Sequence, residues 1–164
     1  KKCLGQLVIK DMDNKPVDVN NLSEDELIQA ILTFSALPGA SRHHWGTDVD
    51  FYDKNALADD QTLQLEPWEY QENGPFFALT QWLKQHSASY GFYFPYDKYR
   101  GGIAAEPWHL SYFPIAEQFE KQLTPEKLYG CLQTSDIKLK AKVLMTLAEI
   151  YNQYIINIGH NYHG

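Results

Sequence analysis

Two short segments of the chain carry the residues best suited to chemistry. Residues 41–50 read Ser-Arg-His-His-Trp-Gly-Thr-Asp-Val-Asp, and residues 106–109 read Glu-Pro-Trp-His. They offer His43, Asp50 and His109 as metal donors, with Glu106 as a spare carboxylate. Two imidazoles and one carboxylate suit Zn²⁺, whose open fourth position takes a water with its pKa lowered to about 7. The residues therefore predict a zinc hydrolase with Glu106 as general base and acid.

The spacing within the first segment constrains the backbone around it. His43 and Asp50 are too far apart to share one helix face, where partners lie about three or four positions apart. Gly46 permits a turn between them. We therefore expect His43 in a loop and Asp50 on the strand that follows.

The second segment favours a strand. Pro107 lacks a backbone donor and disfavours a helix. From Trp108 to Tyr112 apolar and polar residues alternate, which predicts a strand with His109 and Ser111 on one face.

Helices are expected on either side of these strands. Ser23 and Glu26 form a capping-box pattern before an apolar stripe at helical spacing, after a loop over residues 10–21. A second helix is predicted over residues 75–89, ending at Gly91, and a helical region from Pro125 to the end of the chain. The order predicts an α+β fold with helices packed against a small antiparallel sheet.

Composition bounds the function. The chain has 164 residues, 44% of them hydrophobic, and is expected to form a single domain over residues 1–164. Asp and Glu outnumber Lys and Arg by 21 to 14, giving a net charge of -7, which argues against a nucleic-acid partner.

No apolar run is long enough to predict a transmembrane segment. Because the chain does not begin with Met, we expect it to lack an N-terminal segment of a longer protein. Cys3 and Cys131 are expected to be free thiols.

The two segments resemble a known pair of motifs. Ser41-x-His43-x-x-Gly46-x-x-x-Asp50 followed by Glu106-x-x-His109 is similar to the signature of the VanY-like D-alanyl-D-alanine carboxypeptidases, which trim bacterial cell-wall stem peptides. The resemblance implies Zn²⁺ on His43, Asp50 and His109, Glu106 as catalytic base, and Ser41 as a substrate contact. It also implies the fold shared with D-Ala-D-Ala dipeptidases and the Hedgehog signalling domain.

The resemblance leaves several readings of function open. The first is a zinc D,D-carboxypeptidase acting on peptidoglycan stem peptides, which implies a periplasmic or cell-envelope location. The same chemistry also suits an L,D-carboxypeptidase, a D,D-dipeptidase or a stem-peptide endopeptidase. A zinc-stabilised binding domain without turnover is the non-enzymatic alternative, and an intact Glu106 argues against it. Oligomeric state is not predicted.

Two departures from the family pattern concern the site. Asp48 occupies a position that is usually a small residue, and a second acid there could compete as ligand or shift the pKa of Asp50. The family's upstream arginine segment, which binds the substrate's terminal carboxylate, is not recognisable here. Arg42 and Arg100 are the candidate replacements, with Arg42 inside the motif.

Other residues near the motifs have alternative roles. His44 is the alternative donor to His43, although the family register favours His43. Tyr112, with Trp45 and Trp108, is a candidate for lining a substrate groove, while aromatic residues beside a strand are more often part of a core.

Overall fold

The computed structural model describes residues 2–4, 7–13 and 15–160. They divide into two compact units. Unit 1 comprises Lys1–Ser41, Tyr99–Ala104 and Lys121–Ile158, and unit 2 comprises Arg42–Lys98, Ala105–Glu120 and Gly159–Gly164. The residues predicted to hold a metal all belong to unit 2.

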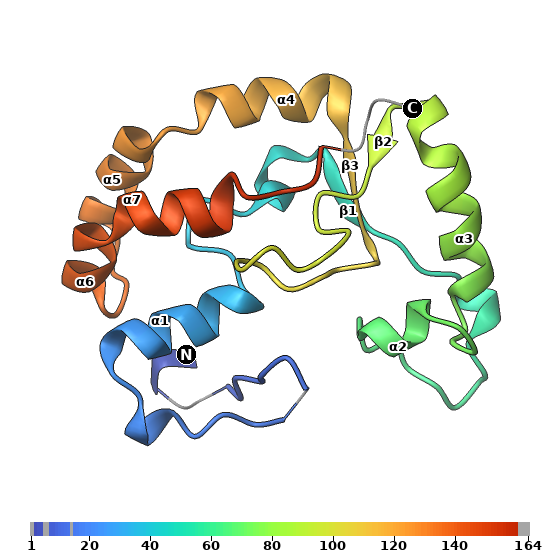
Figure 1. Cartoon of the computed structure of the whole chain (residues 1–164), viewed down its shortest axis with the longest axis horizontal. Helices are drawn as coiled ribbons and strands as arrows, with labels where there is room; N and C mark the ends of the chain where they lie inside the picture. The colour runs from blue at the N-terminus through green and yellow to red at the C-terminus, as the bar shows by residue number, and fades with distance from the viewer. Residues whose placement is uncertain (1, 5–6, 14, 161–164) are drawn as a thin grey trace. The chain divides into compact units, whose positions relative to one another are not determined.

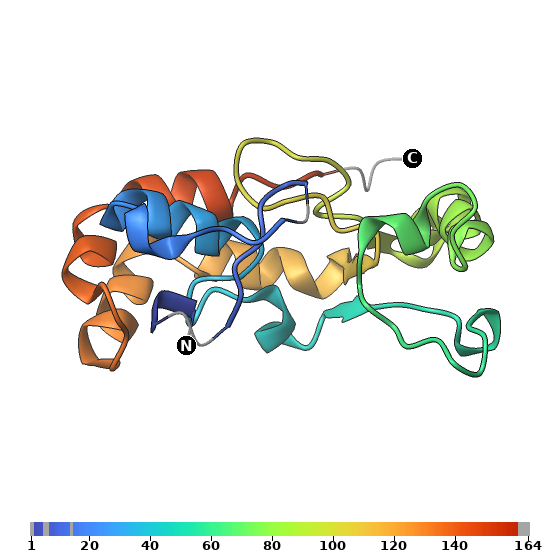
Figure 2. The same cartoon turned by 90° about the horizontal axis from the view of Figure 1, so that it is seen from below.

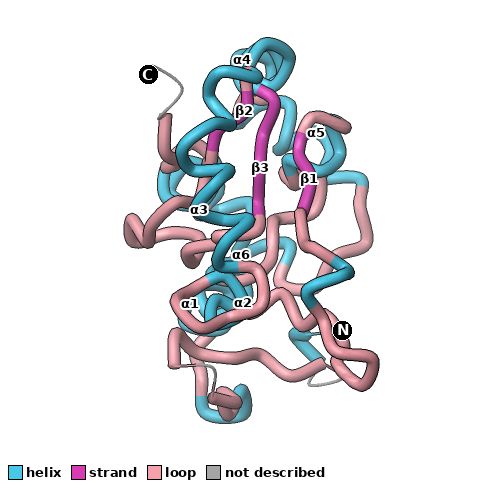
Figure 3. Tube along the Cα trace, turned by 90° about the vertical axis from the view of Figure 1, so that its right-hand side faces the viewer, coloured by secondary structure: helices cyan, strands magenta, loops and turns pink. Residues whose placement is uncertain are grey.

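A three-stranded antiparallel sheet forms the centre of unit 2. Strand β3 (His109–Tyr112) lies between β1 (Asp48–Asp50) and β2 (Phe92–Tyr93), as Figure 3 shows. The register pairs Asp50 with His109 and Asp48 with Ser111. Since side chains alternate between the two faces of a strand, these four side chains share one face. The predicted strand at residues 108–112 and the α+β fold are confirmed.

Helices follow the strands of unit 2. Helix α2 (Pro67–Tyr70) precedes α3 (Phe77–His86), which continues into a 3₁₀ turn (Ser87–Tyr90). Gly91 ends that turn with φ of 80°, a left-handed conformation that glycine adopts without strain, so the predicted stop is confirmed. Helix α4 (Phe113–Gln122) begins directly after β3. Neither α2 nor α4 was expected from the sequence.

Unit 1 is helical. Helix α1 (Glu24–Thr33) begins at the predicted capping box, in which Ser23 and Glu26 bond to each other's backbone amides. In Figures 1 and 2, α1 (blue) gathers with α5 (Pro125–Thr134), α6 (Lys140–Met145) and α7 (Leu147–Ile150), drawn in orange to red. The apolar faces of these helices and residues that follow α1 and α7 share one core, built from Ile28, Leu32, Leu37, Ala40, Leu128, Leu132, Val143, Leu147, Ile150 and Tyr154.

The predicted helical region from Pro125 onward is interrupted, and its last four positions, 161–164, lie outside the described residues. Helix α5 stops at the extended Ser135, and Leu139 has φ of 57° before α6 begins. Ser135 and Asp136 are residues whose side chains compete with helical backbone bonds, which accounts for the break. After α7 the chain continues as a π-helical turn (Tyr151–Ile155).

The remaining segments are short. The predicted loop at residues 10–21 contains an isolated bridge between Lys10 and Pro16 and a 3₁₀ turn (Val19–Asn21). Two further 3₁₀ turns cover Lys2–Leu4 and Lys54–Ala56. Cys3 and Cys131 are free, as expected. Within the described ranges, no helix combines the length and apolar character needed to cross a membrane.

Candidate metal centre

Strand pairing places two of the predicted donors opposite each other. Asp50 ends β1 and faces His109, the first residue of β3. A tight turn precedes His109, closed by its own N–H donating to the Glu106 carbonyl at 3.1 Å, with Pro107 at the second position. The turn brings the side chains of Glu106 and His109 together where the central strand β3 begins.

The third donor comes from a 3₁₀ turn (Arg42–Trp45) rather than an irregular loop. Gly46 follows it with φ of 70°, so the predicted turn at this glycine is confirmed. The reversal lets His43 fold back on β1, where its Nδ1 lies 3.2 Å from the Asp48 carbonyl oxygen. Its Nε2 is thereby directed toward Asp50.

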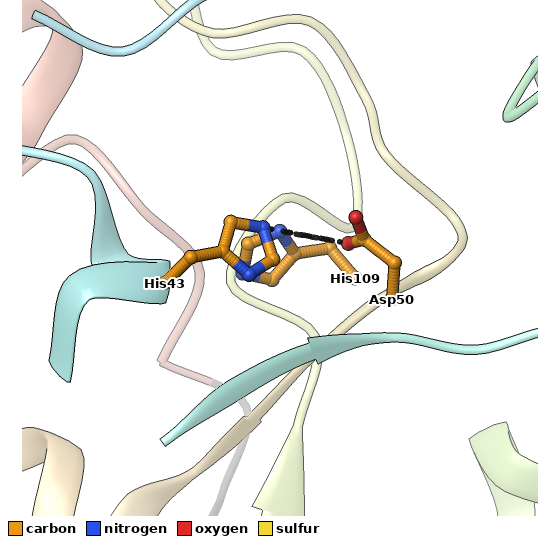
Figure 4. A group of neighbouring side chains, drawn as sticks. All are labelled: His43, Asp50 and His109. Atoms are coloured by element: carbon orange, nitrogen blue, oxygen red, sulfur yellow. Dashed lines mark ion pairs between the residues drawn. The ribbon is translucent and has the colours of Figure 1, made fainter. Parts of the chain in front are cut away.

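The three donors converge on one point. The Oδ1 atom of Asp50 lies 3.5 Å from His43 Nε2 and 3.6 Å from His109 Nδ1, and one donor atom from each residue falls within 4.8 Å of the others. Donors about 2.0–2.1 Å from a tetrahedral metal lie roughly 3.3 Å from one another. Figure 4 shows the three side chains pointing toward one another, with His43 reaching in from its helical turn. They form a candidate metal-binding group whose geometry and chemistry fit a tetrahedral ion such as Zn²⁺.

Glu106 lies beside the three donors but is not one of them. Its Oε2 is 3.1 Å from His109 Nδ1, the same nitrogen that faces Asp50. The Glu106 side chain is partly open to solvent at 20% exposure, whereas His109 is buried. A carboxylate in this position can reach both the donor atoms and an incoming molecule.

The charges of the site perturb its titration. Burial acts to lower the pKa of His109, but its hydrogen bonds to Asp48 and Glu106 outweigh burial and raise that pKa to about 9. Burial raises the pKa of Asp50, although the neighbouring His109 and His43 act to lower it. Without a metal, both ring nitrogens of His109 therefore carry a hydrogen at neutral pH. The Asp48 and Glu106 carboxylates stabilise this imidazolium cation.

Arg42 is buried behind the donors instead of facing a substrate. Its guanidinium is 3% exposed and donates to Asp48 Oδ1 at 2.8 Å and to Glu120 Oε1 at 2.7 Å. It also donates to the Tyr93 and Ser111 hydroxyls, each at 2.8 Å. These bonds commit the cation to the protein's own acids and hydroxyls. The prediction that Arg42 contacts a substrate carboxylate therefore has no support in this arrangement.

Tyr112 and Ser41 are the other two predicted substrate contacts. Tyr112 projects from the face of β3 opposite to His109 and packs on Phe92, with ring centroids 5.1 Å apart. Its predicted place in a substrate groove is therefore not supported. Ser41 is the residue before Arg42 but belongs to unit 1, and its role stays a prediction from the motif.

The aromatic residues next to the motifs have structural contacts. Trp45 stacks on Phe119 with centroids 5.8 Å apart and lies beneath the Arg42 guanidinium, which favours the core interpretation for this residue. Trp108 packs against Tyr70 at 5.6 Å. His44 is exposed and is not a member of the donor group found among the described residues.

Sequence reasoning missed the residues that surround the donors. Asp48 was considered as a competing ligand or as a group that shifts the pKa of Asp50. Its carboxylate instead points into the protein and contacts Arg42, Thr47, Ser111 and His109. Glu120, on the unexpected helix α4, binds both Arg42 and the Tyr93 hydroxyl. The signal available for Asp48 was its two-residue spacing from Asp50, which places both on one strand face.

Comparison with known proteins agrees with the motifs. The family model of VanY, described as D-alanyl-D-alanine carboxypeptidase, matches residues 11–115, a range that contains every donor and Glu106. An uncharacterized protein of Haemophilus influenzae is 37% identical over 126 residues, covering 76% of this chain and 96% of that protein. No solved structure matches the chain. The chain thus belongs to the VanY family of D-alanyl-D-alanine carboxypeptidases.

Proposed function

We propose that the chain is a zinc-dependent carboxypeptidase that removes the terminal D-alanine from peptidoglycan stem peptides. The single observation that carries this proposal is the convergence of His43, Asp50 and His109 with the Glu106 carboxylate beside them. A binding domain would need the donors but not an adjacent, partly open carboxylate. Membership of the VanY family supports the D-Ala-D-Ala substrate.

Each residue has a distinct part in the proposed reaction. His43, Asp50 and His109 would hold the metal, which would supply a water of lowered pKa and a positive charge beside the substrate carbonyl. Glu106 accepts a proton from the attacking water as that water's oxygen bonds to the peptide carbonyl carbon. It then returns the proton to the leaving amine nitrogen as the C–N bond breaks. The products are a shortened peptide with a new carboxylate and free D-alanine.

The Glu106 carboxylate also affects metal binding, because it lies close to His109 Nδ1. At 3.1 Å it competes for the nitrogen that the metal needs. With Nδ1 occupied by a metal, the Glu106 carboxylate would have no hydrogen-bond donor on this ring and would be available to a water molecule. Ser41 is proposed as a substrate contact on the motif alone.

The test is release of D-alanine from a peptide ending in D-Ala-D-Ala, measured on the zinc-loaded chain. Glu106→Gln should abolish release by a factor of at least about 100 while retaining the metal, because the base is not a donor. Glu72→Gln, the same change at an exposed glutamate in a loop of unit 2, should leave both unchanged.

Two outcomes would contradict the proposal. Retention of full activity in Glu106→Gln would remove this residue as the base. Zinc binding by the wild type without D-alanine release, but with cleavage of an L,D bond or an internal stem-peptide bond, would replace the D,D assignment with one of its chemical neighbours.

A further inference from the structure

Asp48 is the most completely enclosed acid of the site, and the proposed reaction does not use it. Its side chain has 0% exposure. Oδ1 accepts a hydrogen bond from Arg42 Nε at 2.8 Å, and Oδ2 accepts from Thr47 Oγ1 at 2.7 Å and Ser111 Oγ at 3.0 Å. A buried carboxylate is costly unless paired, and Arg42 supplies the pairing charge. Asp48 is therefore an ionised acceptor held in a fixed position.

The Asp48 carboxylate also contacts His109, one of the three residues proposed to bind the metal. Asp48 Oδ1 lies 2.9 Å from His109 Nε2. An ionised carboxylate can only accept, so Nε2 must carry the hydrogen of this bond. A neutral imidazole has one N–H, and the lone pair is then left on Nδ1, the nitrogen that faces Asp50.

Glu106 exerts the opposite preference on the same ring. Its carboxylate also accepts only, and at 3.1 Å from Nδ1 it favours a hydrogen on that nitrogen. A ring with its single hydrogen on Nδ1 cannot donate a lone pair to a metal there. The bond from Nε2 to Asp48, shorter and fully buried, is what opposes Glu106.

Asp48 also contacts the second histidine donor, through its main chain. The Asp48 carbonyl oxygen lies 3.2 Å from His43 Nδ1, and a carbonyl can only accept. His43 therefore carries its hydrogen on Nδ1 and presents the lone pair of Nε2 to Asp50. The two histidines present opposite ring nitrogens to the same point, each directed by an oxygen of Asp48.

We propose that Asp48 is a positioning residue that selects the metal-binding tautomer of His109 through its carboxylate and of His43 through its carbonyl. The proposal rests on the metal site of the proposed function. Hydrogen-bond partners of metal-bound histidines typically change metal affinity by about 10- to 100-fold when removed. Arg42 serves this role indirectly, because its guanidinium supplies the charge that holds the Asp48 carboxylate ionised and in place.

The first experiment reads the tautomers directly from two-bond ¹H–¹⁵N correlation spectra of zinc-loaded, ¹⁵N-labelled protein. The expected result is a hydrogen on Nε2 of His109 and on Nδ1 of His43. The same nitrogen protonated in both rings would overturn the proposal. If the chain takes up no zinc, the proposed function fails, and the metal-free spectrum at strongly alkaline pH still decides whether His109 keeps its hydrogen on Nε2.

The second experiment compares variants by zinc competition titration and by metal-free melting temperature. Asp48→Asn keeps the shape but removes the negative charge and replaces one acceptor oxygen with an NH₂ donor, and we expect zinc affinity to fall about 10- to 100-fold. Thr47→Ala removes a bond to the same carboxylate without touching either histidine, and should keep affinity within about threefold of the wild type. Asp59→Asn, an exposed aspartate, is the matched surface control.

These readouts separate positioning from a purely structural role. If Asp48 only stabilised the fold, Asp48→Asn and Thr47→Ala would lower affinity in step with their losses of melting temperature. Unchanged zinc affinity in Asp48→Asn would overturn the inference. Wild-type zinc binding with D-alanine release would still leave the proposed function standing in that case.

Discussion

Metal binding at this site should release a proton from His109. In the metal-free protein the ring lies between Asp48 Oδ1, 2.9 Å from Nε2, and Glu106 Oε2, 3.1 Å from Nδ1. These bonds raise the pKa of His109 to about 9. Because a nitrogen that binds a metal must be unprotonated, His109 would lose its Nδ1 proton on metal binding and keep the hydrogen on Nε2, donated to Asp48 Oδ1.

The pKa of His109 sets how strongly metal affinity depends on pH. With a pKa of about 9, His109 is protonated in roughly 99% of metal-free molecules at pH 7. Metal affinity at pH 7 is then about 100-fold below its limit for a neutral ring, or roughly 3 kcal/mol. Affinity should rise about tenfold per pH unit between about pH 7 and 8.5 and level off above pH 9 or so.

The assay is a competition titration with a chromophoric chelator across this pH range. Calorimetry in buffers of different ionisation enthalpy then counts the protons released. Glu106→Gln supplies an internal comparison, since losing one of the two carboxylates on the ring lowers the pKa of His109. This variant should bind zinc more tightly than the wild type near neutral pH and show a shallower dependence on pH. Affinity that stays constant from about pH 7 to 8.5 in the wild type would refute the reasoning.

Three further predictions test other parts of the structure. Leu132→Ala, at 1% exposure in the core of unit 1, should lower the free energy of unfolding by about 2–5 kcal/mol in urea denaturation, while Met145→Ala at 70% exposure should change it by less than about 0.5 kcal/mol. Gly46→Ala forces a side chain into φ of 70° and should cost about 1–2 kcal/mol, whereas Gly130→Ala within α5 should stabilise by up to about 1 kcal/mol; equal effects would contradict the backbone assignment. Removing the metal with a chelator should lower the melting temperature, because zinc at about 1,000 times its Kd stabilises by about 4 kcal/mol, and His43→Ala should abolish that difference.

The sequence was informative wherever one local rule decides the structure. The alternation around His109 placed it on a strand, Gly46 and Gly91 marked turns by their backbone freedom, and Ser23 with Glu26 marked the start of α1. Each of these depends on residues within a few positions of one another. The order of donors in the two motifs likewise needed no tertiary information.

The residues around the donors are set by how β1 pairs with β3. Local sequence patterns do not reveal that strand register. Asp48 could be assigned as a hydrogen-bond partner of His109 only once β1 was paired with β3. Arg42 looked available for a substrate because its partner Glu120 lies on α4, a helix that sequence analysis did not predict. Tyr112 was assigned to a groove without knowing that its face of β3 is opposite to that of His109.

The central claim, that these three side chains hold a zinc ion that drives hydrolysis, is tested most directly by the rate of D-alanine release during zinc removal and return. The account predicts that release from a D-Ala-D-Ala peptide stops when a chelator removes the metal. It also predicts that release returns in proportion to added zinc, to a maximum at about one ion per chain. Release that continues unchanged in the metal-free chain would contradict the account.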